Sequence, residues 1–213
     1  MTEVLTKAFQ PQYAMFKQDD DGKLFPCVVN GALMDEVLPM MESLGQLLGK
    51  ALWEGLLVEL SFAPFFFAQL TGHYCFLDDL PSYDPELYNS LMHLKYYEGD
   101  ASDLALDFTV VDESFGAYIT HHLRPNGDQI EVNNGNKLQY IYAVADFKLN
   151  QQLRPSIDAF RRGLSKLIRP SWQRLFSPLE VNQLLGGEFT DIDTKVRLIP
   201  CVRGVVRGYF SRQ

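Results

Sequence analysis

The sequence has few cysteines and no pattern that pairs them. Its three cysteines, Cys27, Cys75 and Cys201, lie far apart, are odd in number and show no CxxC spacing. This arrangement predicts neither a disulfide framework nor a zinc site. It is typical of proteins in a reducing cytoplasmic or nuclear compartment.

The chain also lacks a membrane-like hydrophobic run, a secretory leader and an excess of basic residues. The most apolar stretch, residues 44–70, is interrupted by Lys50, Glu54, Glu59 and Pro64, unlike a membrane span. The first residues do not show the pattern of a secretory signal peptide, which is a basic segment followed by an apolar core. With 19 basic and 27 acidic side chains, the net charge is -8, which argues against nucleic-acid binding. We expect a soluble protein that binds neither nucleic acid nor membrane.

What the sequence does contain is enough apolar periodicity to build a helical core with a small sheet. A hairpin is expected around the turn at residues 19–22. A long helix is expected from Pro39, placed in its first turn, to about Leu60. Alternating residues predict strands within 104–132. Residues 1–9 are expected to form the end of a helix. Further helices are expected from Pro64, at 85–96, 138–149 and 157–167, and in 177–187. The expected fold class is α+β, mainly helical.

Short motifs that suggest ligands have simpler explanations. Residues 45–50 read GQLLGK, but the spacing is one residue short for a phosphate loop and Ala51 replaces the hydroxyl that binds magnesium. Asp19, Asp20 and Asp21 lack the alternation and the distal glutamate of a calcium loop. His73 with Cys75, and the pair at 121–122, lack the geometry of a metal site. No cofactor or metal ligand is predicted.

An ordered series of motifs indicates a family. The stretch from Leu44 to Tyr88 contains LGKAL, PFF and DLPSYDPELY. It is followed by YEGD at 97–100, DFTVVD at 107–112, LRPNG at 123–127, NNGNK at 133–137, YIYAVADFKL at 140–149, AFRRG at 159–163 and LFSPLE at 175–180. This order resembles the N-terminal lobe of HECT-type E3 ubiquitin ligases, over about residues 1–193.

The resemblance implies a two-part N-lobe. A larger helical subdomain would comprise residues 1–79 and 134–193, and a smaller, sheet-containing subdomain would comprise residues 80–133. After Asp193 the family pattern stops, and residues 194–213 form a divergent tail with basic but no acidic side chains. A frameshift, a splice variant or a gene-model artefact would each produce such a tail. We expect a fragment or isoform truncated at both ends.

The resemblance also implies that the small subdomain docks a ubiquitin-conjugating enzyme (E2) carrying ubiquitin. The positions that match the family's E2-binding groove are Leu87, Leu91, Tyr97, Leu104 and Tyr140. The alternative is that such apolar residues simply form the core of the subdomain. We expect core positions for Leu94 and Phe108, and groove positions for Leu91, Tyr97 and Tyr140.

No catalytic residue is predicted within this chain. The family works by a thiolate that accepts ubiquitin as a thioester, but that cysteine lies in a separate C-terminal lobe. Cys75 has a superficially similar neighbourhood in the wrong place, and Cys201 lacks the motif. The chain is therefore expected to be the E2-docking part of a ubiquitin transferase, which as a family is an enzyme. The alternative is a catalytically dead E2-binding module that competes with full-length ligases.

Overall fold

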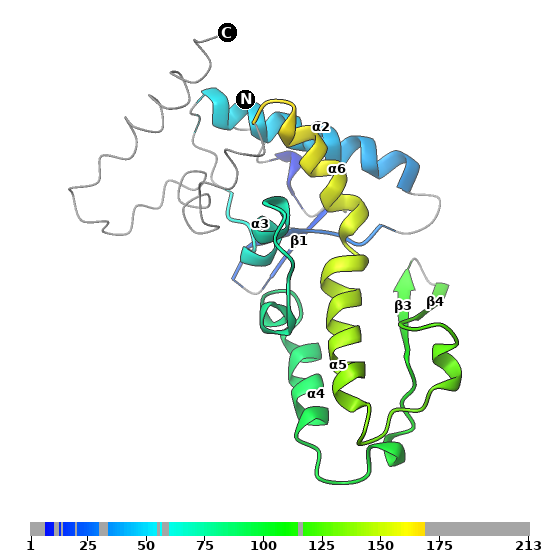
Figure 1. Ribbon diagram of the computed structural model, residues 1–213. Helices are drawn as coiled ribbons and strands as arrows, with labels where there is room; N and C mark the ends of the chain where they lie inside the picture. Colours follow the sequence, from blue (N-terminus) through cyan, green and yellow to red (C-terminus); the bar gives the residue numbers. More distant parts are fainter. Residues whose placement is uncertain are drawn as a thin grey trace, which may run out of the picture.

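The computed structural model describes residues 7–10, 13, 15–19, 21–29, 34–54, 56, 60–114 and 117–168. The expected helix in residues 177–187, the tail from residue 194 and Cys201 lie outside these residues, as do residues 1–6. Figure 1 shows two parts, one above the other. The upper part holds β1 (Phe16–Gln18), β2 (Leu24–Pro26), α2 (Met34–Glu54), α3 (Pro64–Leu70) and α6 (Arg154–Ser165).

The lower part holds the elements between α3 and α6 in the sequence. These are η3 (Leu77–Ser82), α4 (Pro85–Lys95), η4 (Ala101–Leu104), β3 (Thr109–Ser114), β4 (Ala117–His122), η5 (Gly127–Gln129) and α5 (Lys137–Asp146). Helix α5 packs against α4 and η3. With helices and two small two-stranded sheets, the described chain has the mainly helical α+β fold expected from the sequence.

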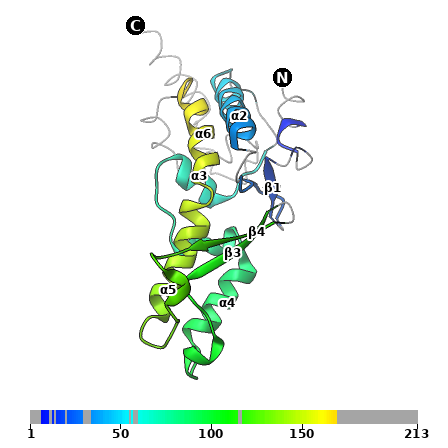
Figure 2. The same ribbon diagram turned by 90° about the vertical axis from the view of Figure 1, so that its right-hand side faces the viewer.

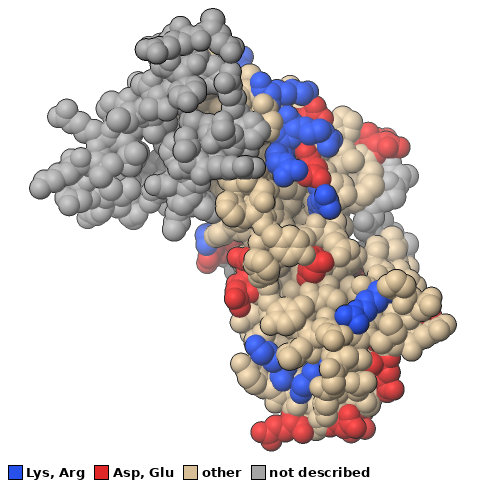
Figure 3. All heavy atoms as spheres, viewed as in Figure 1, with Lys and Arg blue, Asp and Glu red and all other residues tan. Residues whose placement is uncertain are grey.

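Helices α2 and α6 pack so closely that their backbones touch. A Cβ atom on Gly45 would lie 2.1 Å from the carbonyl oxygen of Phe160, and one on Gly163 would lie 1.8 Å from that of Glu42. Only glycine, which has no Cβ, permits this approach. Glu42 adds ion pairs to Arg162 and Lys166, in the region of α6 and α2 where basic side chains gather in Figure 3.

The bounds of α2 differ from those expected. The helix begins at Met34, so Pro39 lies inside it rather than in its first turn, and it ends at Glu54 rather than near Leu60. Pro39 has no N–H, so the helix lacks the backbone hydrogen bond that residue 39 would otherwise donate to the carbonyl of Asp35. At the other end the amide of Leu56 donates to the carbonyl of Ala51 at 2.9 Å, which closes the last turn.

The predicted N-terminal hairpin is confirmed. β1 pairs with β2 in antiparallel register, with Phe16 opposite Pro26 and Gln18 opposite Leu24. In the turn between them, Gly22 has a φ of 77°, a conformation that glycine adopts without strain. Leu24 also bridges to Phe62, which brings the segment before α3 beside the hairpin.

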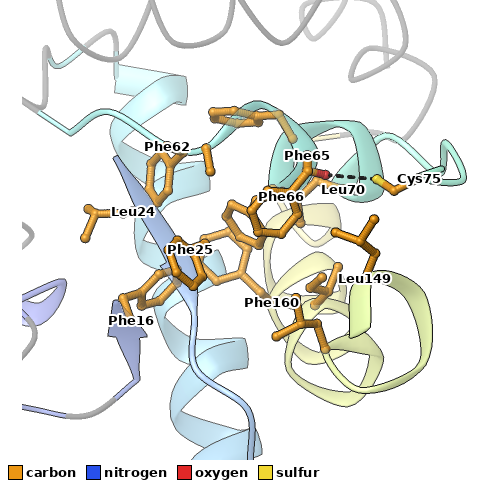
Figure 4. Close-up of a cluster of buried hydrophobic side chains, with 14 of the residues drawn as sticks. Phe16, Leu24, Phe25, Phe62, Phe65, Phe66, Leu70, Cys75, Leu149 and Phe160 are labelled. Carbon is orange, nitrogen blue, oxygen red and sulfur yellow. Dashed lines mark hydrogen bonds between the residues drawn. The ribbon is translucent and has the colours of Figure 1, made fainter. Parts of the chain in front are cut away.

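Aromatic rings fill the core of the upper part. Figure 4 shows Phe16, Phe62, Phe66 and Phe160 gathered between the hairpin, α3 and α6. Their ring centroids are 5.5 to 6.2 Å apart, mostly edge to face. Such pairs combine large apolar burial with a favourable quadrupole geometry. The aromatic run at 65–67 is therefore structural.

In the lower part, the expected sheet is a single hairpin. β3 pairs with β4 from Thr109 opposite His122 to Ser114 opposite Ala117. Figure 2 shows this hairpin crossing beside α5, with α4 below it. Most of the remaining residues in 104–132 form short 3₁₀ turns and loops, joined by a bridge between Asp107 and Glu131.

A nearly continuous helical rod connects the two parts. It consists of α5, a π-helical turn η6 (Phe147–Gln151) and α6, as Figure 1 shows in yellow-green and yellow. The sequence predicted two separate helices here. Among the described helices, none has the length and apolar character needed to cross a bilayer.

Candidate functional site

Helix α4 supports the first two predicted site residues, and the sequence fixes where it starts. The carboxylate of Asp84 caps it by accepting a hydrogen bond from the amide of Leu87 at 2.8 Å. Pro85 occupies the first helical turn, where no amide proton is needed. Lys95 lies in the last turn, where a cation faces the negative end of the helix dipole. The predicted helix at 85–96 is confirmed.

Leu87 and Leu91 lie one turn apart on the inner face of α4. Leu91 is only 4% exposed and belongs to the core, while Leu87 is half-buried against it. Leu94, 5% exposed, and Phe108, fully buried, take the core positions expected for them. Leu91 therefore lies beneath the surface and supports it from within.

Tyr97 is held in the loop that follows α4. Its ring folds over Gly99, where a Cβ would lie 2.7 Å from ring atoms Cε1 and Cζ. Its carbonyl accepts a hydrogen bond at 2.9 Å from the ammonium of Lys137, the first residue of α5. The side chain of Asn134 also bonds the amide of Ala101 and the carbonyl of Gly99. The loop after α4 is thus tied to the start of α5.

Tyr140 lies one turn beyond Lys137 on α5. Its ring is half-buried and meets the ring of Phe108 edge-on at 5.5 Å. Burial raises the pKa of the Tyr140 hydroxyl, and the nearby negative charge of Asp107 adds to this effect. The hydroxyl therefore stays protonated at neutral pH and can donate a hydrogen bond.

Leu104 stands at the surface at the end of η4, with 40% of its area exposed. Leu87, Leu91 and Tyr140 lie on α4 and α5, and Tyr97 is bonded to the first residue of α5. Leu104 lies instead in the segment that connects α4 to β3. Three exposed carboxylates, Glu98, Asp100 and Asp103, lie in the same loop. Acidic side chains accordingly mark the bottom of the lower part in Figure 3.

The structure reveals a groove that the sequence reasoning missed. It is shallow and open, encloses about 570 Å³, and is lined by Asn89, Met92, His93, Tyr96, Tyr97 and Glu98. Its α4 residues recur at i, i+3, i+4 and i+7, on the face opposite the buried leucines. That second stripe is visible in the sequence and could have been found. Of the five predicted residues, Tyr97 alone lines this groove.

The two cysteines within the described residues are unsuited to nucleophilic attack. Cys75 is 1% exposed, its sulfur lies 3.6 Å from the carbonyl oxygen of Phe65, and burial raises the pKa of its thiol to about 12. Burial also raises the pKa of the Cys27 thiol. The thiolate is the reactive form, and both sites disfavour it. In the described part of the chain, no group of three His, Cys, Asp or Glu side chains could hold a metal ion.

Known proteins are similar to this sequence over most of its length. The family model for the HECT-domain (ubiquitin-transferase) matches residues 2–198. E3 ubiquitin-protein ligase UPL6 of Arabidopsis thaliana is 38% identical over 91% of this chain, and a probable E3 ubiquitin protein ligase of Schizosaccharomyces pombe is 40% identical over 91%. Human ubiquitin-protein ligase E3B is 35% identical over 91%. The chain spans only 19%, 19% and 18% of the lengths of these relatives. The chain therefore belongs to the HECT-domain (ubiquitin-transferase) family.

Proposed function

We propose that this chain is the E2-docking part of a HECT-type ubiquitin transferase. It receives an E2 charged with ubiquitin, so that ubiquitin passes through a cysteine thioester to a substrate lysine. The observation that carries the proposal is the family match over residues 2–198, which includes every element that supports the candidate site.

The docking surface we propose consists of Leu87, Leu91, Tyr97, Leu104 and Tyr140. Small interfaces depend on a few aromatic or apolar anchors set in a supporting frame. Tyr97 fits this role because Gly99 and Lys137 already restrain its loop, which reduces the entropy lost on binding. Leu104 supplies exposed apolar area.

The acidic loop favours an E2 surface that carries basic side chains. Glu98, Asp100 and Asp103 are exposed beside Tyr97 and Leu104. Complementary charge of this kind mainly accelerates encounter and weakens as salt rises. We expect the association rate with a productive E2 to fall with increasing ionic strength.

The chemical step needs a thiolate that this site does not provide. A thiolate must attack the carbonyl carbon of the E2 thioester, with the E2 thiolate leaving, before a lysine amine attacks the new thioester. Cys75 is buried and its thiol is held protonated. We assign the acceptor to the C-terminal lobe that the family places after the N-lobe. The docking part contributes proximity and orientation.

Binding to a panel of purified E2 enzymes tests the proposal. The Tyr97→Ala variant should bind a productive E2 more weakly by about 1–3 kcal/mol, as expected for an anchor near the centre of an interface. Leu91→Ala should weaken binding too, but its burial makes a thermal melt of the variant essential. Isothermal titration calorimetry measures both.

Tyr96 offers a matched control. It neighbours Tyr97, is 72% exposed and lines the same groove, but it does not belong to the proposed docking surface. Tyr96→Ala should leave the affinity unchanged. If a folded Tyr97→Ala variant binds as tightly as the wild type, the site assignment is wrong. If the wild type binds no E2 in the panel, the function itself is wrong.

A further inference from the structure

The chain passes between the upper and lower parts at two places. Residues 71–76 lead down from α3, and residues 147–153 lead up from α5 to α6 through the π-helical turn (Figure 1). A π turn is wider than an α turn and is often found at functional positions in helices. These two crossings are the places where the parts can bend relative to each other.

The two crossings are fastened to one another. The side chain of Asn150 accepts from the amide of Cys75 at 3.1 Å and donates to its carbonyl at 2.8 Å. Gln69 donates to the carbonyl of Leu149 at 2.8 Å. The hydroxyl of Tyr74 donates to the carboxylate of Asp146. These hydrogen bonds hold the two crossings side by side. A rotation of the lower part relative to the upper part would therefore take place about the line that joins the two crossings.

The β3–β4 hairpin also contacts the π turn, through a set of hydrogen bonds from Lys148 and Gln152 to Asp112 that we call the Asp112 clasp. The carboxylate of Asp112 on β3 accepts hydrogen bonds from the ammonium of Lys148 and from the side-chain amide of Gln152. The side chains of Asp112 and Lys148 are only 12% and 17% exposed. His121 on β4 completes the contact, because its ring lies 4.9 Å from that of Phe147.

Tyr83 makes an apolar contact between the parts. The ring of Tyr83 lies 5.5 Å from Phe25 and 5.5 Å from Phe65. Edge-to-face ring pairs are found over centroid distances of about 4.5–7 Å, so they tolerate small rotations. A charge-assisted hydrogen bond shielded from water has a narrow range of distance and angle. The geometry of the Asp112 clasp is therefore more narrowly defined than that of the Tyr83 contact.

We infer that Asp112 is a positioning residue, which through Lys148 and Gln152 sets the angle between the lower and upper parts. The importance of that angle rests on the proposed function, because a transferase must hold the E2 thioester at a defined place relative to its acceptor. The clasp itself is independent of any E2.

The test measures the angle directly, as a distance distribution between two spin labels. Labels are placed at exposed positions by Glu36→Cys on α2 and Glu86→Cys on α4, in the full chain with Cys201→Ser. Cys27 and Cys75 are buried and stay unlabelled. Pulsed electron paramagnetic resonance should give one narrow distribution for this background. Asp112→Asn and Lys148→Met should each broaden it about twofold, as the lower part samples more orientations.

Two variants separate positioning from general destabilisation. Lys148→Arg keeps the charge and should keep the narrow distribution. Glu42→Gln removes a carboxylate that also holds two cations, Arg162 and Lys166, but within the upper part, so it should leave the width unchanged. If Asp112→Asn does not fold, Lys148→Met decides the matter. Wild-type width in the folded Lys148→Met variant overturns the inference. Titration with E2 is a separate readout, so failure of docking would leave the distance result standing.

Discussion

Cys75 shows how a single residue's environment decides its chemistry. Its neighbours Tyr74 and Phe76 are 57% and 66% exposed, while Cys75 itself is 1% exposed. Successive side chains of an extended segment point to opposite sides, so the aromatic pair faces outward and the sulfur faces the core. The sequence motif alone does not distinguish this arrangement from a reactive cysteine.

We predict that Cys75 resists alkylation in the folded protein. Its thiol pKa of about 12 in the fold lies above the ordinary value of 9.0, so the thiol is protonated and inaccessible at pH 8. Iodoacetamide labelling followed by mass spectrometry should modify Cys75 only after urea unfolding. Ionisation of Cys75 should favour unfolding only as the pH rises through the window from 9.0 to about 12, because below it both states are protonated.

The Cys201→Ser background removes the cysteine that lies outside the described residues, and Cys27 serves as a second buried control. Rapid, stoichiometric labelling of Cys75 at pH 8 without denaturant would contradict the structure. It would also reopen the question of Cys75 as an acceptor of ubiquitin.

The candidate docking residues illustrate how far residue-level prediction reaches. The spacing of Leu87, Leu91 and Leu94 correctly indicated one inner face of α4, and Leu94 proved to be core. The same spacing could not show that Leu91 is as deeply buried as Leu94. Burial depends on what packs against the helix, and α5 is separated from α4 by more than forty residues in sequence. The E2-docking role of the five residues stays a prediction.

Helix α4 carries the proposed site, so its N-cap matters more than those of other elements. Asp84→Ala removes the acceptor for the amide of Leu87 and should destabilise the protein by about 0.5–2 kcal/mol. Urea unfolding followed by circular dichroism measures the change. Asp84→Asn keeps an oxygen acceptor and should behave like the wild type. Equal stability of the alanine and asparagine variants would show that the cap contributes nothing.

Element bounds were predicted best where local chemistry marks them. Asp84 and Pro85 mark the start of α4 regardless of its surroundings, and Gly22 marks the N-terminal turn. The bounds of α2 were wrong at both ends: the helix begins before Pro39, at Met34, and ends at Glu54. Apolar periodicity marks the buried face of a helix but not its ends. The join of α5 to α6 through a π turn was also missed. No local sequence signal distinguishes a π turn from a helix break.

The core runs through both parts of the molecule without interruption. Phe16 and Phe160 of the upper part belong to the same buried cluster as Leu91 and Ile141 of the lower part. A shared core couples the stability of both parts. We predict a single cooperative unfolding transition in urea, in which peptides from α2 and α4 lose hydrogen-exchange protection at the same denaturant concentration.

Mass spectrometry of hydrogen exchange at increasing urea concentrations makes this measurement. Loss of protection in α4 well below the midpoint for α2 would show that the lower part unfolds by itself. The Asp112→Asn variant is informative here as well. This variant should broaden the distance distribution between the spin labels. It should have much less effect on whether α2 and α4 lose protection at the same urea concentration, because the substitution leaves the shared core unchanged.

The sequence alone determined the family, the mainly helical α+β class, the hairpin at Gly22 and the start of α4. These follow from local signals: the order of motifs, the periodicity of apolar residues, and the backbone preferences of Gly, Pro and capping Asp. Only the tertiary structure decided the burial of Cys75, the groove beside Tyr96, and the clasp between Asp112 and Lys148. Each of these features depends on which distant segments pack together. The free energy gained by burying a side chain or pairing two charges depends on the residues that surround it in the folded chain.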